Sequence, residues 1–131
     1  MSRILLLIVI ATLCQGLFSM ALAMSDEEMT NKIIGEWYAE DENGSTVYLF
    51  NKDGSWTENG VYYFKDGPKE VSLEGKWYIE KGYFYHSVVK CNLPAKIKEG
   101  KFDKIKIKYV SDNEFFMLLA PGNLAPHFTK K

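Results

Sequence analysis

Turn-forming residues recur along the chain at short intervals, and this regular spacing constrains the fold more than any other feature of the sequence. They are Asn43-Gly44, Asp53-Gly54, Asn59-Gly60, Asp66-Gly67-Pro68, Lys81-Gly82, Glu99-Gly100, Asp112-Asn113 and Pro121-Gly122-Asn123. Such pairs favour tight turns, because Gly and Asn adopt backbone angles that other residues avoid. After residue 34 no stretch has sustained helical periodicity. We therefore predict an all-β chain built as an antiparallel meander.

Eight extended runs lie between these turns. We predict strands at residues 33–40, 45–51, 54–64, 69–80, 83–90, 101–110, 113–120 and 124–130. The run 69–80 alternates most clearly, because its even-numbered positions are mainly charged and its odd-numbered positions mainly apolar. Strands with one solvent-exposed face and one buried face are typical of a closed up-and-down barrel, although a two-sheet sandwich would also have such strands. The Asn59-Gly60 pair is either a further hairpin or, as we prefer, a bulge where one long strand bends around the barrel.

A short polar segment before the first strand has the features of a helix N-terminus. Ser25 and Glu28 have the spacing of a capping box, and the early acidic residues suit the positive end of a helix dipole. Gly35 and Trp37 then fall on one face of the first strand. Because Gly has no side chain, another segment can lie close beside it. We predict a short helix that closes one end of a barrel, with Trp37 filling that end from inside.

Residues 1–23 have the pattern of a cleaved signal peptide. Arg3 provides positive charge, an apolar run follows, and residues 21–23 read Ala-Leu-Ala, a small-x-small cleavage pattern. A retained membrane anchor is the alternative, but polar and small residues interrupt the apolar character after residue 13. We predict a signal peptide at 1–23 and one domain at 24–131. The mature protein would be periplasmic or secreted, with no transmembrane segment after cleavage.

The charge balance gives little support for a nucleic-acid partner. All 16 basic residues except Arg3 are lysines, and they are set against 17 acidic residues. The predicted mature chain therefore lacks the guanidinium groups that bind phosphate and guanine in a bidentate way. It also keeps a single cysteine, Cys91, so it can form no internal disulfide. We expect no binding of nucleic acid.

No pattern of catalytic, metal-binding or cofactor-binding residues can be identified. His86 and His127 are far apart in the sequence and have no acidic or Cys neighbour at ligand spacing. Cys91 is not surrounded by a nucleophile motif. A serine nucleophile elbow, a phosphate-binding loop and a pair of catalytic acids are also missing. The sequence therefore predicts a protein that is not an enzyme and that needs no metal and no cofactor.

Four short motifs are spread over nearly all of residues 24–131. They are Gly35-x-Trp37 after a short helix, Leu49-Phe50-Asn51-Lys52-Asp53-Gly54, Gly75-Lys76-Trp77-Tyr78-Ile79 and a terminal Phe128-Thr129-Lys130. Together they resemble small bacterial lipocalin-like domains and, more distantly, the lipocalin superfamily. The resemblance implies an eight-stranded antiparallel barrel whose central cavity often carries a small apolar molecule. Larger lipocalins commonly place an Arg over the motif Trp, and here Lys130 is the candidate for a weaker cation–π contact.

The interior of such a barrel can be filled by side chains or can hold a ligand. We predict nine inward, ligand-binding residues: Trp37, Phe50, Trp56, Tyr63, Leu73, Trp77, Tyr85, Ile107 and Met117. The hydroxyl groups of Tyr63 and Tyr85 would orient the ligand. The preferred function is the binding and transport of a small hydrophobic or amphipathic molecule. The alternative is a protein-interaction module, such as an inhibitor of an exogenous hydrolase, with a filled barrel and a function in loops 91–100 and 121–124.

Two outer surfaces are candidates for a protein or lipid partner. Six lysines between residues 96 and 108 either form a basic face or simply keep the strands soluble and their edges unpaired. The run 113–120 is apolar on both faces, so something must cover Phe116 and Leu118. The N-terminal helix, through Met29 and Ile33, or a partner protein could do so.

Overall fold

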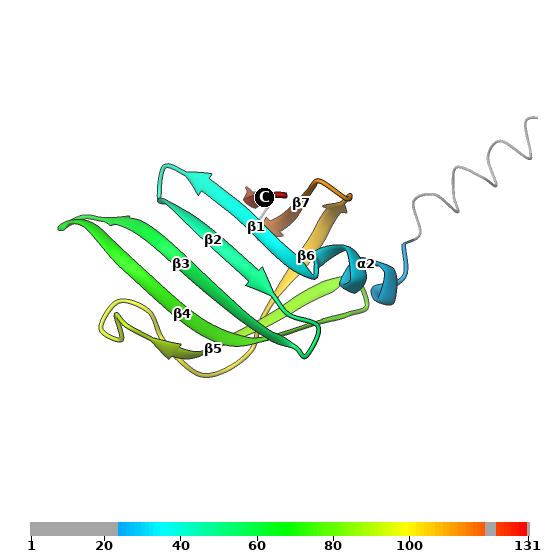
Figure 1. The fold of residues 1–131 in the computed structure, drawn as a ribbon, viewed down its shortest axis with the longest axis horizontal. Helices are drawn as coiled ribbons and strands as arrows, with labels where there is room; N and C mark the ends of the chain where they lie inside the picture. Colours follow the sequence, from blue (N-terminus) through cyan, green and yellow to red (C-terminus); the bar gives the residue numbers. More distant parts are fainter. Residues whose placement is uncertain (1–23, 120–122, 131) are drawn as a thin grey trace, which may run out of the picture.

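The computed structural model describes residues 24–119 and 123–130 and shows one helix followed by eight strands (Figure 1). The elements are α2 (Asp26–Ile33), β1 (Gly35–Asp41), β2 (Gly44–Phe50), β3 (Ser55–Phe64), β4 (Gly67–Glu80), β5 (Tyr83–Cys91), β6 (Asp103–Val110), β7 (Glu114–Leu119) and β8 (Asn123–Lys130). The predicted signal peptide at 1–23 lies outside the described residues, as do residues 121 and 122 of the predicted loop 121–124.

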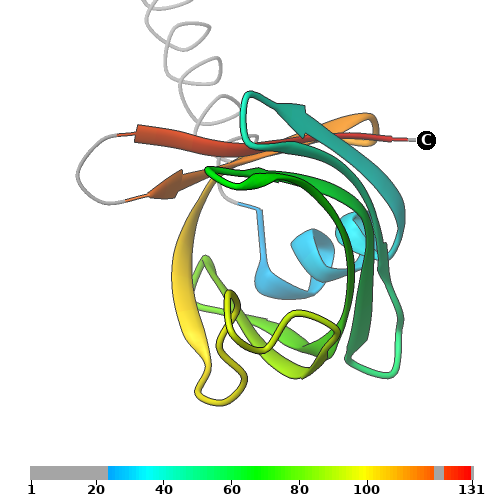
Figure 2. The same cartoon turned by 90° about the vertical axis from the view of Figure 1, so that its left-hand side faces the viewer.

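Each strand pairs in antiparallel fashion with the next one along the chain, and β1 also pairs with β8. The sheet therefore closes into an up-and-down barrel, which Figure 2 shows from one end. This confirms the all-β class and the eight predicted strands, and it excludes the two-sheet sandwich. The inner side chains of β4 are buried and the outer ones are mostly exposed, as the alternation of residues 69–80 predicts.

The Asn59-Gly60 pair lies inside the single strand β3, so the interpretation as a further hairpin is wrong. Gly60 is paired with Thr46 on one side and Val71 on the other, and neither ladder has a register shift at this point. A Cβ atom on Gly60 would lie 2.7 Å from the Cα of Thr46, so no larger residue fits there. The strand passes through this position without a bulge, so the preferred interpretation as a bulge is also wrong, although the prediction of one long strand is confirmed.

Helix α2 closes one end of the barrel, as predicted (Figure 2). Ser25 caps the helix, because the Glu28 N–H donates to Ser25 Oγ at 3.1 Å and the Ser25 hydroxyl donates to Glu28 Oε1 at 3.3 Å. The Asp26 carboxylate accepts hydrogen bonds from the backbone N–H groups of Lys81 (2.6 Å) and Gly82 (2.9 Å) in the turn between β4 and β5. The helix thus lies against the barrel and is fastened to it by its first residue.

Trp37 fills the closed end from inside, as the sequence predicts. Its side chain is fully buried, and its Nε1–H donates to the Ile33 carbonyl at 2.7 Å. The predicted cation–π contact is present, because Lys130 Nζ lies 4.5 Å from the centre of the Trp37 ring. A Cβ atom on Gly35 would overlap with the same ammonium group. The Gly-x-Trp spacing therefore leaves room for the lysine that covers the tryptophan.

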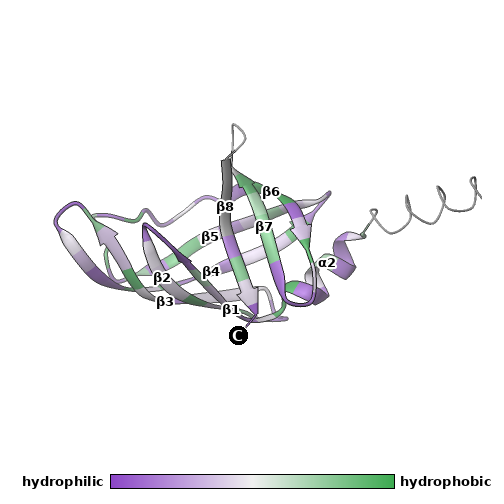
Figure 3. Ribbon diagram, turned by 90° about the horizontal axis from the view of Figure 1, so that it is seen from above, coloured by the Kyte–Doolittle hydropathy of each residue, from purple (hydrophilic) through white to green (hydrophobic). Residues whose placement is uncertain are grey.

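Neighbouring rings cover the outer face of β7, whereas helix α2 lies against β4 and β6. Phe116 stacks on His127 of β8 with ring centroids 4.2 Å apart, and Tyr109 of β6 lies 6.0 Å away. Met29 and Ile33 are buried where α2 lies against β4 and β6. Figure 3 shows the hydrophobic middle of β7 between β6 and β8. The apolar second face of this strand is therefore partly covered within the molecule itself.

Candidate functional site

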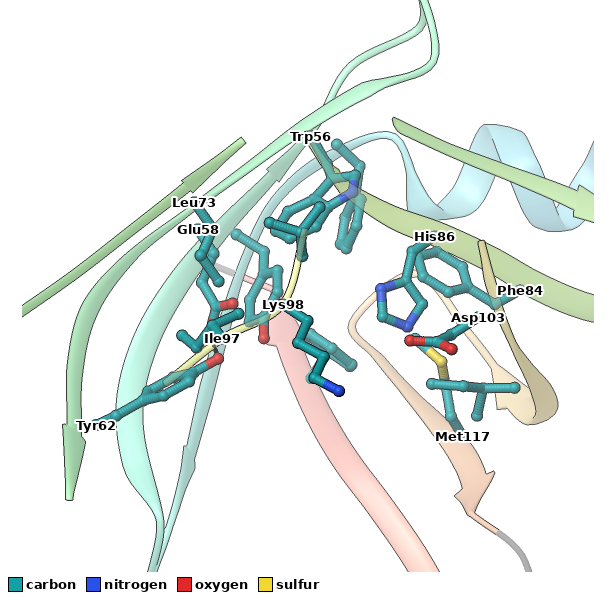
Figure 4. A pocket seen from close by; sticks show the side chains of 15 residues that line it. Trp56, Glu58, Tyr62, Leu73, Phe84, His86, Ile97, Lys98, Asp103 and Met117 are labelled. Carbon is teal, nitrogen blue, oxygen red and sulfur yellow. Dashed lines mark hydrogen bonds between the residues drawn. The ribbon is translucent and has the colours of Figure 1, made fainter. Parts of the chain in front are cut away.

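A cavity of about 350 Å³ lies inside the barrel (Figure 4). Its wall is built from β2 to β8 and from the connection between β5 and β6, and most of its surface is apolar. The residues that line it are Tyr48, Phe50, Trp56, Glu58, Tyr62, Leu73, Phe84, His86, Val88, Ile97, Lys98, Asp103, Ile105, Met117 and Phe128. Alternate residues of each strand thus point toward a common space that side chains do not fill.

Seven of the nine predicted interior residues have an inward or core position. Phe50, Trp56, Leu73 and Met117 line the cavity. Trp37 and Trp77 belong to the packed hydrophobic core, and Ile107 is half-buried against it. Whether any of these residues binds a ligand stays a prediction.

Tyr63 and Tyr85 do not face the interior, so the prediction that their hydroxyls orient a ligand there is wrong. Tyr63 is 53% exposed. Tyr85 stacks on the exposed Tyr78, with ring centroids 4.6 Å apart, on the outer face. Because β3 alternates without a bulge, Tyr62 takes the inward position and Tyr63 the outward one.

The most important residue that the sequence analysis missed is Glu58, which is only 2% exposed. It follows Trp56 by two residues and therefore shares its inward face on β3. Strict alternation from Trp56 through Glu58 to Tyr62 could have identified it. The expectation that charged residues face solvent argued against an inward carboxylate.

Three hydroxyl side chains surround the Glu58 carboxylate. Tyr62 donates its hydroxyl proton to Glu58 Oε2 at 2.6 Å, and Tyr48 and Thr46 also hydrogen-bond to this carboxylate. Burial raises the pKa of Glu58 above its usual value, although these hydrogen bonds act in the opposite direction. Burial and the nearby Glu58 charge raise the pKa values of Tyr48 and Tyr62, so both phenols stay protonated at neutral pH.

A second cavity, of about 330 Å³, adjoins the first at this polar cluster. Both cavities are lined by Tyr48, Glu58 and Tyr62. The remaining residues around the second cavity come from β1, β2, β8 and the turn between β1 and β2, and they are Ala39, Glu40, Asp41, Asn43, Gly44, Thr46 and His127. Glu58 therefore stands in the wall that the two spaces share.

Two further charged groups and a histidine stand at the side of the larger cavity formed by β5 and β6. Pairing between these strands ends at His86 and Asp103, and the connection between them places Lys98 in the wall of the same cavity. Burial lowers the pKa of His86 more than the charge of Asp103 raises it, so the imidazole is neutral at neutral pH. Asp103 and Lys98 are exposed and opposite in charge.

The connection between β5 and β6, residues 92–102, is tied to the barrel by side-chain contacts. Asn92 accepts a hydrogen bond from the Ser72 N–H at 2.9 Å and donates to the Glu70 carbonyl at 3.1 Å, so it extends the pairing beyond the end of β5. Lys96 lies 3.1 Å from Asp66 and 4.7 Å from the centre of the Phe64 ring. These contacts hold the segment that carries Ile97 and Lys98 into the cavity wall.

Within residues 24–119 and 123–130, no group of three or more His, Cys, Asp and Glu side chains is placed to hold a metal ion. None of the helices in these ranges is long and apolar enough to span a membrane.

The fold can be compared with known proteins. No family model and no curated protein matches this sequence. The crystal structure of a lipocalin-like protein from Bacteroides uniformis does match, with a TM-score of 0.54 over 76% of this chain and 99% of that one. The fold is lipocalin-like. Because the sequence identity is 16%, the lipocalin-like comparison shows the architecture alone, and it confirms the resemblance that the motifs around Trp37 and Trp77 indicate.

Proposed function

We propose that this lipocalin-like protein binds a small hydrophobic or amphipathic molecule inside its barrel. The observation that carries the proposal is the cavity of about 350 Å³ with mainly apolar walls. Ligand pockets of roughly 300–1,000 Å³ with apolar walls and a few polar groups are typical of small-molecule sites. The interior has both properties, because rings such as Phe84 and Phe128 line it and Glu58, Tyr62 and His86 supply the polar groups.

Burial of apolar surface would provide most of the affinity. Each Å² of apolar surface removed from water contributes about 25 cal/mol, before the cost of immobilising the ligand is subtracted. The closed end, with Trp37 and α2, is already packed and would not have to rearrange on binding. A largely preformed pocket lowers the cost of ordering side chains.

The alternative function, a protein-interaction module, was predicted together with a filled barrel. Because side chains leave a cavity inside the barrel, the structure gives no support to an interaction module with a filled core, and we do not propose this function. Export to the periplasm or the medium remains part of the proposal and rests on the sequence of residues 1–23. The proposal includes no catalytic step.

Titration with the uncharged dye N-phenyl-1-naphthylamine tests the proposal. Trp56 lines the cavity, so a dye bound there should quench tryptophan fluorescence and gain emission of its own. Val88→Phe places a larger side chain in the cavity wall and should weaken dye binding about ten-fold or more. Val89→Phe is the matched control, because Val89 is 55% exposed on the outer face. Equal dye binding by both variants and the wild type, or none by the wild type, would contradict the proposal.

A further inference from the structure

Glu58 is the only charged side chain that is fully buried in the part of the chain the structure describes. Glutamate is rarely buried in this way unless a positively charged group is paired with it. None of the ion pairs formed between described residues includes Glu58. Its known partners are the neutral hydroxyls of Tyr62, Tyr48 and Thr46. The carboxylate is therefore solvated by hydrogen bonds but lacks a counter-charge.

Glu58 lies where a ligand in the cavity could supply the counter-charge that the described residues do not. The carboxylate stands in the wall shared by the two cavities, which Tyr48 and Tyr62 also line. Figure 4 shows Glu58 beside Tyr62 in the larger cavity. The larger cavity offers apolar surface to one part of a ligand. A polar group of the same ligand could reach Glu58 from that side without leaving the barrel.

The remaining charges around the two cavities favour a positive group over a negative one. Glu40 and Asp41 line the second cavity, and no lysine is among the residues that line it. In the larger cavity, exposed Lys98 and Asp103 offset each other. A ligand carboxylate near Glu58 would meet a like charge in a poorly solvated place, which is strongly unfavourable.

We propose that the ligand is an amphipathic amine, whose apolar part occupies the larger cavity and whose ammonium group pairs with the Glu58 carboxylate. This rests on the proposed function and narrows it to one chemical class. The ammonium would donate hydrogen bonds to the carboxylate, and charge-assisted bonds of this kind are about twice as strong as neutral ones. The electron-rich faces of Tyr48 and Tyr62 would add cation–π attraction.

Three ligands with the same alkyl chain and different head groups test the assignment: decylamine, decanol and decanoate. Each is titrated below its aggregation concentration against the protein at neutral pH, by displacement of N-phenyl-1-naphthylamine and by calorimetry. We expect decylamine to bind at least about ten-fold more tightly than decanoate, with decanol between them. Glu58→Gln should remove most of the preference for decylamine and leave decanol binding nearly unchanged. Glu74→Gln removes the same charge from an exposed position of β4 and should change nothing.

The outcomes separate the two proposals. If decanoate binds as tightly as decylamine, or if Glu58→Gln binds decylamine as well as the wild type does, the amine assignment is wrong while the ligand-binding function stands. If none of the three compounds displaces the dye and the dye itself does not bind, both proposals fail. Should Glu58→Gln not fold, the ranking of the three head groups on the wild-type protein still decides the question.

Discussion

At the scale of single residues, Glu58 is the clearest place where the chain departs from what stability alone favours. A carboxylate that is 2% exposed and has only neutral partners costs free energy of folding, because hydrogen bonds to hydroxyls only partly replace water. An apolar residue on the same face of β3 would avoid that cost. Such exceptions to local rules occur most often where a protein binds or reacts.

The raised pKa of Glu58 predicts how stability depends on pH. In the folded protein Glu58 holds its proton more tightly than in the unfolded chain, where its pKa is near 4.5. The contribution of Glu58 to stability therefore falls as pH rises from below 4.5 through the folded pKa. In the Glu58→Gln variant the side chain at this position does not titrate. The free energy of unfolding of the variant minus that of the wild type should therefore grow as pH rises from about 4 through the folded pKa of Glu58.

Urea unfolding of both proteins at a series of pH values measures this difference. Asp53, Asp66 and Asp112 have lowered pKa values, so they lose their stabilising effect as pH falls. They are present in both proteins, and their effect cancels in the comparison. A difference that is constant with pH would show that the Glu58 pKa is not raised.

Two glycines show how a shared motif can have different local causes. In Gly35-x-Trp37 the glycine leaves space for the Lys130 ammonium. In Gly75-x-Trp77 it leaves space for Trp56, whose Nε1 would lie 2.5 Å from a Cβ atom at this position and donates to the Ser87 carbonyl at 3.1 Å. The same Gly-x-Trp spacing therefore makes room for a lysine side chain in one strand, and for a tryptophan side chain and the backbone of β5 in the other.

At the scale of elements, the helix depends on its attachment to the barrel. An isolated helix of eight residues is too short to be stable in water. Buried Met29 and Ile33 supply apolar contact, and the Asp26 carboxylate holds the turn between β4 and β5. Lys81 in that turn has a positive φ of 52°, which a residue other than glycine adopts at some cost. The helix and the turn thus support each other.

Asp26→Ala should therefore loosen the closed end of the barrel. It removes two hydrogen bonds to a charged acceptor, and we expect a loss of about 1–2 kcal/mol in the free energy of unfolding. Hydrogen exchange of the Lys81 and Gly82 amides should become faster, which mass spectrometry can measure. Glu27→Ala is the matched control, because it removes the same charge from the same helical turn at an exposed position and should cost less than about 0.5 kcal/mol. Similar effects of the two substitutions would argue against the attachment.

At the scale of the whole molecule, closure of the barrel depends on a short contact between its first and last strands. Among the described residues, strand β1 pairs with β8 through Trp37–Lys130, Tyr38–Thr129 and Ala39–Phe128. The Lys130 side chain crosses this seam, lies over the Trp37 ring and donates to the Ile34 carbonyl at 3.3 Å. One residue thus links the last strand, the motif tryptophan and the end of the helix.

Lys130→Gln should weaken that seam. Loss of the cation–π contact at a partly exposed site costs about 0.5–1 kcal/mol, and amides of β1 and β8 should exchange faster with solvent. Lys104→Gln is the comparison, because Lys104 lies over the Tyr83 ring at 4.4 Å away from the seam. Lys104→Gln should lower the free energy of unfolding by a similar amount without changing amide hydrogen exchange in β1 and β8. Unchanged exchange at the seam in Lys130→Gln would count against this role.

The sequence by itself determined the class, the strands and the closed end. Turn residues and alternation act over a few neighbouring positions, so they fixed the eight strands, and the capping box and the position of Trp37 followed from equally local patterns. The cation–π contact of Lys130 came from the family resemblance.

The tertiary structure alone decided which tyrosines face inward and whether side chains fill the interior. The direction of Tyr62 and Tyr63 depends on β3 passing Gly60 without a bulge, which its pairing with both neighbouring strands decides. The cavity depends on how far opposite walls stand apart once β1 meets β8. Glu58 acquires its environment in the same way, because Thr46, Tyr48 and Tyr62 come together around it only when the strands are side by side. These are properties of the closed sheet, and no local pattern contains them.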